Sequence, residues 1–268
     1  NNLSFYDYYN KNGLLRTLMI RTSSNGELMV LIQFFENNLK KITGLLNHLI
    51  SKFPSISSLN YCINSKENDT IYDQEIICFS GKSYITESME NLRFKITPKS
   101  FYQTNSEQAF ELYKIALDYS AIKTSDIVYD LYTGTGTIAQ FISKKCKKVI
   151  GIESVPEAIE AAKFNTKVNK IKNAEFIVGD MKVVFNDEFI KKYGKADIII
   201  TDPPRDGMHK KVIEQILKLS PKKIVYISCN SATQARDLFL LKSNYKITRS
   251  RAIDMFPQTH HIENVVLL

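Results

Sequence analysis

Apolar and polar positions follow two different rhythms along this chain, and the rhythm changes near residue 96. Residues 14–22 and 27–35 are rich in apolar and β-branched side chains, and the segment between them ends in Asn25-Gly26. An Asn-Gly pair favours the tight turns that join antiparallel strands. Residues 14–35 are therefore predicted to form a β-hairpin.

Two further patterns precede residue 96. Apolar side chains recur at helical spacing in residues 42–53, and short β-rich runs occupy residues 76–85 and 92–96. With the hairpin, these elements predict a small α+β domain over residues 1–95.

After Pro98 short apolar runs alternate with helical periodicity. The runs with strand character are residues 126–131, 148–152, 174–178, 198–201 and 223–228, and those with helical character are residues 155–169, 207–219 and 232–241. Strands that are apolar on both faces and separated by helices are typical of a parallel sheet covered on both sides. We expect a doubly wound, Rossmann-like α/β domain over residues 96–268.

Composition narrows the class of protein. The 268 residues are 44% apolar, enough for one or two globular domains. The longest apolar stretches, such as residues 28–32, fall far short of the roughly 18 residues that a membrane helix needs. The four cysteines are widely spaced without a Cys-x-x-Cys pair, which argues against a zinc site or disulfide framework and suits reduced thiols in the cytoplasm.

The net charge is positive and unevenly distributed. Lys and Arg number 36 against 28 Asp and Glu, and residues 96–268 hold 26 basic and 19 acidic residues, so this part carries +7 of the +8. A basic surface favours a polyanionic partner such as RNA. The basic run of Lys144, Lys145, Lys147 and Lys148 could touch phosphates, although a solvated helix end is the better explanation of it.

A glycine motif follows the first strand of the α/β domain. Gly134, Gly136 and Ala139 have the G-x-G-x-x-A spacing that lets a nucleoside cofactor approach the backbone, and Glu153 ends the next strand, where it could accept hydrogen bonds from ribose hydroxyls. Both NAD and S-adenosylmethionine sites use these features.

Acids at successive strand ends favour the methyl donor. Asp130, Glu153, Asp180 and Asp202 each follow one of four consecutive strands and would meet in one crevice. A carboxylate at Asp130 suits the methionine ammonium group and would repel a pyrophosphate. Each acid taken alone could instead cap a helix.

A thiol and an acid complete the candidate chemistry. Cys229 ends the fifth strand and is followed by Ser231-Ala232-Thr233-Gln234, a capping-box pattern, so the thiol should lie near a helix N-terminus that promotes its ionisation. Glu263 begins a terminal strand, where shielding by Phe256 could raise its pKa and make it a general base. His260 and His261 fit polar structural contacts better.

Four motifs in order then resemble one family, the RNA uracil-C5 methyltransferases that form 5-methyluridine. They are D-L-Y-T-G-T-G, T-D-P-P-R-D-G, I-S-C-N-S-A-T-Q-A-R-D and D-M-F-P-Q-T-H-H-I-E, and F-Y-Q-T-N at residues 101–105 is similar to a segment that enters the family's site from outside the sheet. The resemblance covers essentially the whole chain and is nearest to the bacterial 23S rRNA enzymes. It implies transfer of a methyl group from S-adenosylmethionine to C5 of a specific uridine, in 23S rRNA.

The resemblance also implies roles for individual residues. Cys229 would be the nucleophile that adds to C6 of an unstacked uracil, and Glu263 the base that removes the C5 proton. The positions that match cofactor contacts are Gln103, Tyr132, Gly134, Glu153, Asp180 and Asp202, and those near the target base are Phe101, Asp202 and Arg205. No metal is implied.

The chain departs from the family at its N-terminus. Members usually begin with an oligonucleotide-binding barrel, and many carry a cysteine cluster for iron and sulfur, but neither pattern occurs here and the chain starts at Asn1 without Met. We expect that such a region is missing from this chain, and that an iron-sulfur cluster could belong only to it.

Other functions stay open on the sequence. A tRNA uracil-C5 methyltransferase is the first alternative, followed by an enzyme that methylates amino groups of nucleic acid, an NAD-dependent dehydrogenase and an RNA-binding module without activity. The expected protein is a cytoplasmic monomer with RNA as its partner and no contact with membranes.

Overall fold

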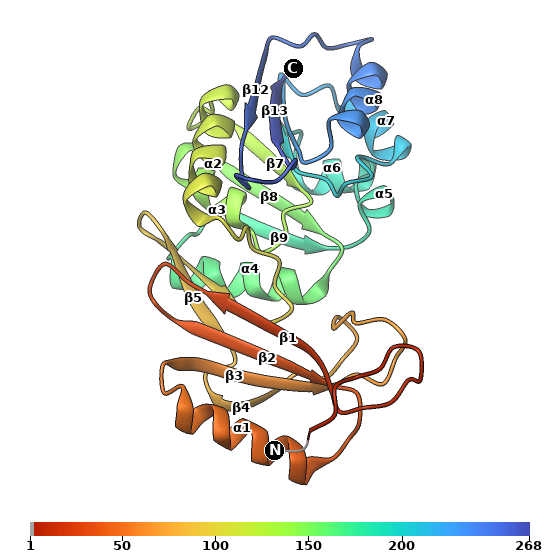
Figure 1. The fold of residues 1–268 in the computed structure, drawn as a ribbon. Helices are drawn as coiled ribbons and strands as arrows, with labels where there is room; N and C mark the ends of the chain where they lie inside the picture. The colour runs from red at the N-terminus through yellow and green to blue at the C-terminus, as the bar shows by residue number, and fades with distance from the viewer. Residues whose placement is uncertain (1–2) are drawn as a thin grey trace. The chain divides into compact units, whose positions relative to one another are not determined.

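The computed structural model describes residues 3–268 and divides into two compact units, unit 1 (Asn1–Ser100) and unit 2 (Phe101–Leu268). Figure 1 labels their helices and strands. The division follows strand β6 by four residues, whereas the sequence placed the boundary after residue 95.

Unit 1 contains a four-stranded sheet of order β1-β2-β3-β4, one helix and a separate two-stranded hairpin. Its elements are β1 (Leu15–Thr22), β2 (Leu28–Phe34), α1 (Leu39–Lys52), β3 (Ile56–Ile63), β4 (Ile77–Gly81), β5 (Ile85–Met89) and β6 (Leu92–Ile96). The antiparallel pairing of β1 with β2 confirms the predicted hairpin. Helix α1, which the Asn38 side chain caps by accepting from Lys41 N at 3.2 Å, joins β2 to the parallel strand β3.

Strand β3 was not predicted, because polar residues occupy its buried positions. Ser58 and Asn60 are both 0% exposed, and Asn60 Nδ2 donates to Ser58 Oγ at 2.8 Å. Since buried polar groups need such partners, the strand hides its polar side chains inside the unit instead of showing a hydrophobic alternation.

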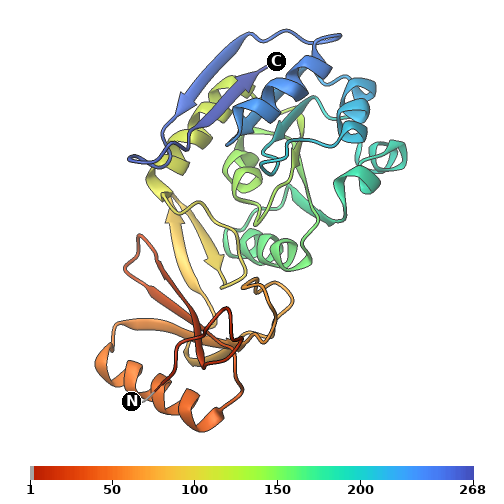
Figure 2. The ribbon, with the colours of Figure 1, turned by 45° about the vertical axis from the view of Figure 1, so that its right-hand side comes forward.

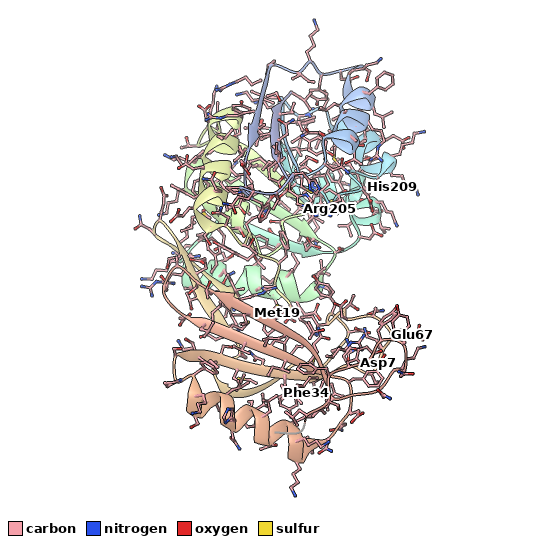
Figure 3. All side chains as sticks on the ribbon, in the orientation of Figure 1. Asp7, Met19, Phe34, Glu67, Arg205 and His209 are labelled. Atoms are coloured by element: carbon pink, nitrogen blue, oxygen red, sulfur yellow. The ribbon has the colours of Figure 1, made fainter. Side chains whose placement is uncertain are left out.

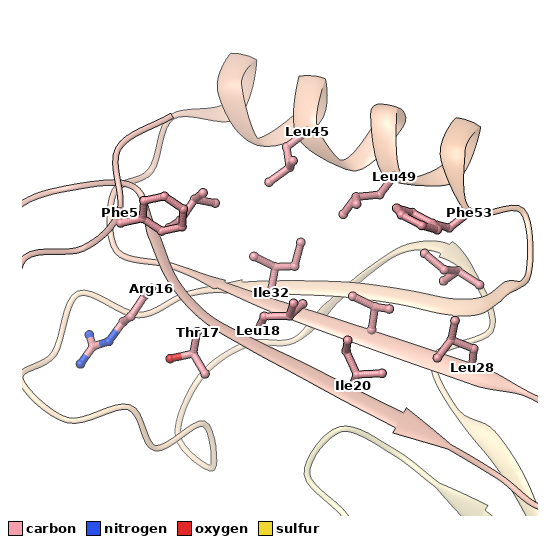
Figure 4. A pocket seen from close by; sticks show the side chains of 13 residues that line it. Phe5, Arg16, Thr17, Leu18, Ile20, Leu28, Ile32, Leu45, Leu49 and Phe53 are labelled. Atoms are coloured by element: carbon pink, nitrogen blue, oxygen red, sulfur yellow. The ribbon is translucent and has the colours of Figure 1, made fainter. Parts of the chain in front are cut away.

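The core of unit 1 lies between α1 and the sheet, but one part of this face stays open. Ile42 and Leu46 of α1 are buried against the strands. Beside them an apolar cavity of about 500 Å³ is lined by Leu18 and Ile20 of β1 and by Leu49, among others (Figure 4). Leu18 and Ile20 are more than half exposed, so β1 is only partly covered.

Unit 2 is built on a seven-stranded sheet of order β12-β13-β11-β10-β7-β8-β9. Its strands are β7 (Ile127–Leu131), β8 (Lys148–Glu153), β9 (Ala174–Val178), β10 (Ile198–Thr201), β11 (Lys223–Ser228), β12 (Arg249–Ile253) and β13 (Glu263–Leu267). Its helices are α2 (Ser106–Ser120), α3 (Thr137–Ile142), α4 (Pro156–Val168), α5 (Met181–Val184), α6 (Asp187–Tyr193), α7 (Lys210–Leu219) and α8 (Ser231–Leu241), with a 3-10 turn at Ser143–Lys145.

The predicted doubly wound α/β fold is confirmed. Strands β7 to β11 pair in parallel, and only β13 and β12 run antiparallel at one edge. Helices cover both faces of this sheet (Figures 1 and 2). Strand β10 could be predicted from the sequence because all four of its residues, Ile198–Thr201, are buried.

Some elements of unit 2 were not predicted. These are the helices α2, α3, α5 and α6, most of them short, and the edge strand β12. Strand β12 is exposed at four of its five positions, so it lacks the apolar signal of an interior strand. Within residues 3–268 no helix combines the length and apolar character needed to cross a membrane.

Candidate active site

The strand order brings the four predicted acids to one edge of the sheet. Strands β10, β7, β8 and β9 are neighbours, and Asp202, Asp130, Glu153 and Asp180 stand at or just beyond their carboxyl ends. The charge of Glu153 helps raise the pKa of Asp130, and the charge of Asp130 helps raise that of Asp202. At least three acids therefore lie within electrostatic reach of one another.

Asp130 is a fully buried carboxyl with one satisfied oxygen. Its Oδ2 accepts hydrogen bonds from the Thr133 hydroxyl and from Ala139 N at 3.0 Å, which ties the strand to the glycine loop. Its Oδ1 is buried and has no hydrogen-bond partner among the described residues. Burial raises the pKa of Asp130 to about 7. A buried orphan oxygen of this kind is a place for an absent donor.

The glycine loop adopts the close approach that its spacing predicted. Gly134 and Gly136 have φ values of +54° and +75°, and a Cβ at Gly136 would lie 2.7 Å from the Phe176 ring, so only glycine fits there. A Cβ at Gly134 would meet no atom within 4 Å, which shows open space beside this residue. Glu153 Oε2 accepts from Gly134 N at 3.1 Å, so the acid of β8 also supports the loop.

A cavity of about 290 Å³ opens at the strand ends. Tyr132, Asp180, Lys182, Pro204 and His209 are among the residues that line it, and Cys229 and Glu263 are not. Asp180 caps α5 by accepting from Lys182 N at 3.1 Å and pairs with Lys182 Nζ at 3.1 Å. Helix capping therefore does account for this one acid, which still faces the cavity.

Cys229 lies between β11 and α8 and is partly exposed. Burial, Glu263 and Asp202 raise the pKa of its thiol, and Arg205 partly offsets them. The expectation of an ionisation-promoting setting was thus wrong for the free protein, because burial, together with Glu263 and Asp202, outweighs the effect of Arg205 on the pKa of the thiol. The same interactions show that Glu263, Asp202 and Arg205 lie within electrostatic reach of Cys229. Figure 3 marks Arg205 and His209 on the loop that follows β10.

The helix cap after Cys229 differs from the predicted capping box. Asn230, and not Ser231, is the N-cap of α8, and its side chain accepts from Ala232 N at 3.1 Å. The Gln234 side chain is buried and donates to Tyr226 O at 3.1 Å, so it does not reach back to the cap. Asn and Ser are comparable N-cap residues, so the sequence alone did not distinguish Asn230 from Ser231.

Glu263 begins β13 and is 6% exposed. Burial raises its pKa, as predicted, and Arg205 opposes this shift. Its Oε2 has no hydrogen-bond partner among the described residues. A thiol, a protonatable acid and a guanidinium in one place can act as nucleophile, base and anion-stabilising group.

Phe101 and Gln103 lie at the start of unit 2, in the segment that precedes α2. Phe101 is 66% exposed and Gln103 is buried. Asn105 caps α2 and its Nδ2 donates to Met255 O at 3.2 Å, which ties this segment to the stretch that precedes β13.

The candidate histidines, His260 and His261, and the basic run that includes Lys148 contribute less to the candidate site. The rings of His260 and His261 lie 4.1 Å apart, and Lys148 pairs with Glu175 at 2.9 Å. Within residues 3–268 no group of three or more His, Cys, Asp or Glu could hold a metal ion.

Tyr113 of α2 was missed by the sequence analysis. It is 5% exposed, and burial together with Asp202 raises its pKa well above the usual value. Its hydroxyl shares a hydrogen bond with Thr137 at the start of α3. Since α2 itself was not predicted, nothing in the sequence pointed Tyr113 toward the acids.

Comparisons with known proteins give a consistent result. The tRNA (Uracil-5-)-methyltransferase family matches residues 72–268. Two proteins described as uncharacterized RNA methyltransferases, from Porphyromonas gingivalis and Bacteroides thetaiotaomicron, are 54% and 55% identical to this chain and cover 98% and 99% of it. The chain covers only 57% and 59% of them, so it spans less than two thirds of these relatives.

A solved structure is similar over nearly the whole chain. The tRNA (uracil-54, C5)-methyltransferase of Pyrococcus abyssi, in complex with S-adenosyl-L-homocysteine, superposes with a TM-score of 0.81 at 31% identity. The match covers 99% of this chain and 62% of that one. The tRNA m1G37 methyltransferase of M. jannaschii, at 16% identity and a TM-score of 0.55, shares the fold alone.

Proposed function

The chain belongs to the tRNA (uracil-5-)-methyltransferase family, and from this premise we propose that it methylates C5 of a uridine in RNA with S-adenosylmethionine as donor. One observation carries the proposal. Cys229 at the end of β11 and Glu263 at the start of β13 lie within electrostatic reach of each other, beside Asp202 and Arg205.

The strand-end acids fit the cofactor. The orphan Oδ1 of Asp130 could accept from an ammonium group, Glu153 from ribose hydroxyls, and the cavity beside Tyr132 and Asp180 could take the base of the nucleoside. The P. abyssi enzyme was solved with S-adenosyl-L-homocysteine, which supports the same class of ligand here. Gln103 and Gly134 are proposed contacts by motif similarity.

The reaction follows from what these side chains can do. The Cys229 thiolate would add to C6 of the uracil and push an electron pair toward C5 and O4, and Arg205 would stabilise the negative charge. When bound, S-adenosylmethionine would supply an electrophilic methyl group for C5. Glu263 would then remove the C5 proton while the C6–S bond breaks and the ring double bond re-forms. Asp202 and Phe101 are proposed to contact the base.

The choice of RNA rests on different observations. We propose 23S rRNA from the motif resemblance, and the similarity to a tRNA enzyme supports tRNA as the second candidate. A cytoplasmic monomer is proposed in either case. Mapping 5-methyluridine in ribosomal and transfer RNA from cells lacking the protein decides between them.

A trapping experiment tests the chemistry. Glu263→Gln should accumulate a denaturation-stable protein–RNA adduct carrying a labelled methyl group, because the proton that must leave C5 stays in place. Cys229→Ala should form no adduct. Cys78→Ala, which removes an exposed thiol in unit 1, should behave as the wild type. An adduct that survives Cys229→Ala contradicts the proposed nucleophile.

Calorimetry tests the cofactor class. S-adenosylmethionine should bind, and NAD should not. Binding of RNA should weaken steeply with salt if several Lys and Arg contact phosphates. Tight binding of NAD alone would favour a dehydrogenase instead.

A further inference from the structure

The loop after β10 is held at its backbone by the first turn of α8. We call residues 202–208 the Arg205 loop. Asn230 Nδ2 donates to the Arg205 carbonyl at 3.0 Å, and the Thr233 hydroxyl donates to the same oxygen at 2.9 Å. These two bonds fix the backbone of Arg205 against the helix that begins just after Cys229.

Asp237, about two turns further along α8, holds the end of the same loop. Its side chain is entirely buried. Oδ2 accepts from Met208 N and from the Tyr226 hydroxyl, both at 2.7 Å, and Oδ1 accepts from Arg236 Nε and Nη2 at 2.9 and 2.7 Å. Each oxygen therefore accepts two hydrogen bonds, and a buried charge that is satisfied in this way is costly to disturb.

The loop backbone touches α8 directly. Arg236 Nη2 donates to Asp206 O at 2.8 Å and to Met208 O at 3.4 Å. Gly207 has a φ of +74°, and a Cβ there would lie 2.6 Å from Asp237 Oδ2. No side chain can separate the two segments, so a change at Asp237 is transmitted to the loop.

Charged groups from two segments, strand β13 and the Arg205 loop, act on the thiol of Cys229. The charged groups that face it are Glu263 from β13 and Asp202 and Arg205 from the Arg205 loop. The two acids raise the pKa of the thiol, and Arg205 is the cation that lowers it. The distance between the Arg205 guanidinium and the thiol depends on how the loop is held against α8.

We propose that Asp237 is a positioning residue that locks the Arg205 loop to α8 and so keeps the Arg205 cation beside Cys229. The inference rests on the proposed role of Cys229 as nucleophile. Asp237 acts through Met208 and Arg236, and it needs no contact with cofactor or RNA.

Alkylation of Cys229 by iodoacetamide, followed by mass spectrometry of its peptide across a pH series, tests this directly. Asp237→Asn keeps the size of the side chain but turns one acceptor oxygen into a donor, which cannot pair with Met208 N or, in the flipped amide, with the Arg236 guanidinium. We expect alkylation at pH 7 to slow by about three- to tenfold, with the profile displaced to higher pH, because the thiolate loses a neighbouring cation.

Two further variants show whether the effect runs through Arg205. Arg205→Gln should slow alkylation similarly, and the double variant should be no slower than Arg205→Gln alone, because both changes remove the same interaction. Asp118→Asn, an exposed acid of α2 that pairs with Arg249 at 2.8 Å, should leave the profile unchanged.

The outcomes separate cleanly. A folded Asp237→Asn protein with the wild-type profile overturns the proposal, and so does additive slowing in the double variant. If Asp237→Asn does not fold, Thr233→Val decides, since its only effect on the Arg205 loop is to remove the hydroxyl bond to Arg205 O, the other bond of this hydroxyl being to Asn230 O at the start of α8. A smaller slowing supports the proposal and an unchanged profile overturns it. The assay needs neither cofactor nor RNA, so a protein that responds as expected but does not methylate uracil fails only the proposed function.

Discussion

Glu87 of unit 1 and two acids at the strand ends of unit 2 are all buried, but their carboxylates are satisfied differently. In unit 1, Glu87 is 3% exposed and accepts hydrogen bonds from Ser24 N, the Ser24 hydroxyl and Ser88 N. In unit 2, Asp130 and Glu263 each leave one buried oxygen without a partner among the described residues. A satisfied carboxylate supports the fold, whereas an unsatisfied one costs stability and marks a place where a ligand or a proton is expected.

The cavities repeat this contrast. The larger one, about 500 Å³ in unit 1, is lined almost wholly by aliphatic and aromatic side chains, and the smaller one, about 290 Å³ in unit 2, includes Asp180, Lys182 and His209. Volume therefore does not locate the chemistry in this protein. The proposed site is marked instead by the unpaired carboxylate oxygens of Asp130 and Glu263.

The strongest test of the difference between satisfied and unsatisfied carboxylates is how the unfolding free energy of unit 2 depends on pH. Folded Asp130 keeps its proton to about pH 7, while its ordinary pKa is 3.8. Between these values the folded state binds more protons than the unfolded state, so the unfolding free energy should fall as pH rises, by up to about 4 kcal/mol. Asp130→Asn should show a smaller decline, because only Asp202 and Glu263, whose pKa values are also raised, still contribute to it, and the variant should be more stable than the wild type at pH 8 while binding S-adenosylmethionine far more weakly.

Denaturant unfolding at several pH values, with hydrogen exchange to report each unit, measures this. Unit 1 serves as the internal control, because its buried Cys62 has a pKa raised to about 11 and does not titrate in this window. If the unfolding free energy declines equally with pH in the wild type and in Asp130→Asn, the Asp130 carboxyl is not the cause of the decline.

Leu46→Ala should destabilise unit 1 and leave the reactivity of Cys229 in unit 2 unchanged. Leu46 is 0% exposed on the buried face of α1, and truncating such a side chain to alanine costs about 3 kcal/mol. Exchange of β2 amides should accelerate accordingly, whereas the rate of Cys229 alkylation should not change. A large change at Cys229 would mean that the two units are not chemically separate.

Gly136→Ala should destabilise unit 2 by about 2 kcal/mol, because alanine would have to adopt the positive φ of Gly136 and its methyl group would meet the Phe176 ring. Gly134→Ala is the matched control: its φ is also positive, but the methyl group enters open space, so thermal unfolding should shift less. Equal losses in the two variants would show that backbone strain alone, and not the close packing at Gly136, is responsible.

Gly44→Ala should have the opposite sign and the smallest size. Gly44 lies within α1 with no atom near the position of a Cβ, so alanine should stabilise unit 1 by about 1 kcal/mol. A higher midpoint for unit 1 alone, by hydrogen exchange, is the expected result, and any loss of stability would contradict it.

Part of this structure could be predicted because local pattern and burial agree. The hairpin of β1 and β2 and the parallel strands β7 to β11 are such cases. Strand β3 could not, since its polar residues Ser58 and Asn60 are buried and hydrogen-bond to one another only once the chain has folded. The helix cap at Asn230 was misassigned by one residue, because neighbouring Asn and Ser are both good caps and the surrounding packing selects between them.

The candidate site divides in the same way. The residue types and their order along the chain, with Asp130, Glu153, Cys229 and Glu263 at strand ends, can be read directly from the sequence, because strand ends in such a sheet converge on one edge. Only the tertiary structure decided that burial and two acids together outweigh Arg205 at the thiol, that Asp130 keeps an unpaired oxygen, and that Asp237 joins α8 to the Arg205 loop. These properties depend on distance and burial between segments far apart in the chain, which no local pattern encodes.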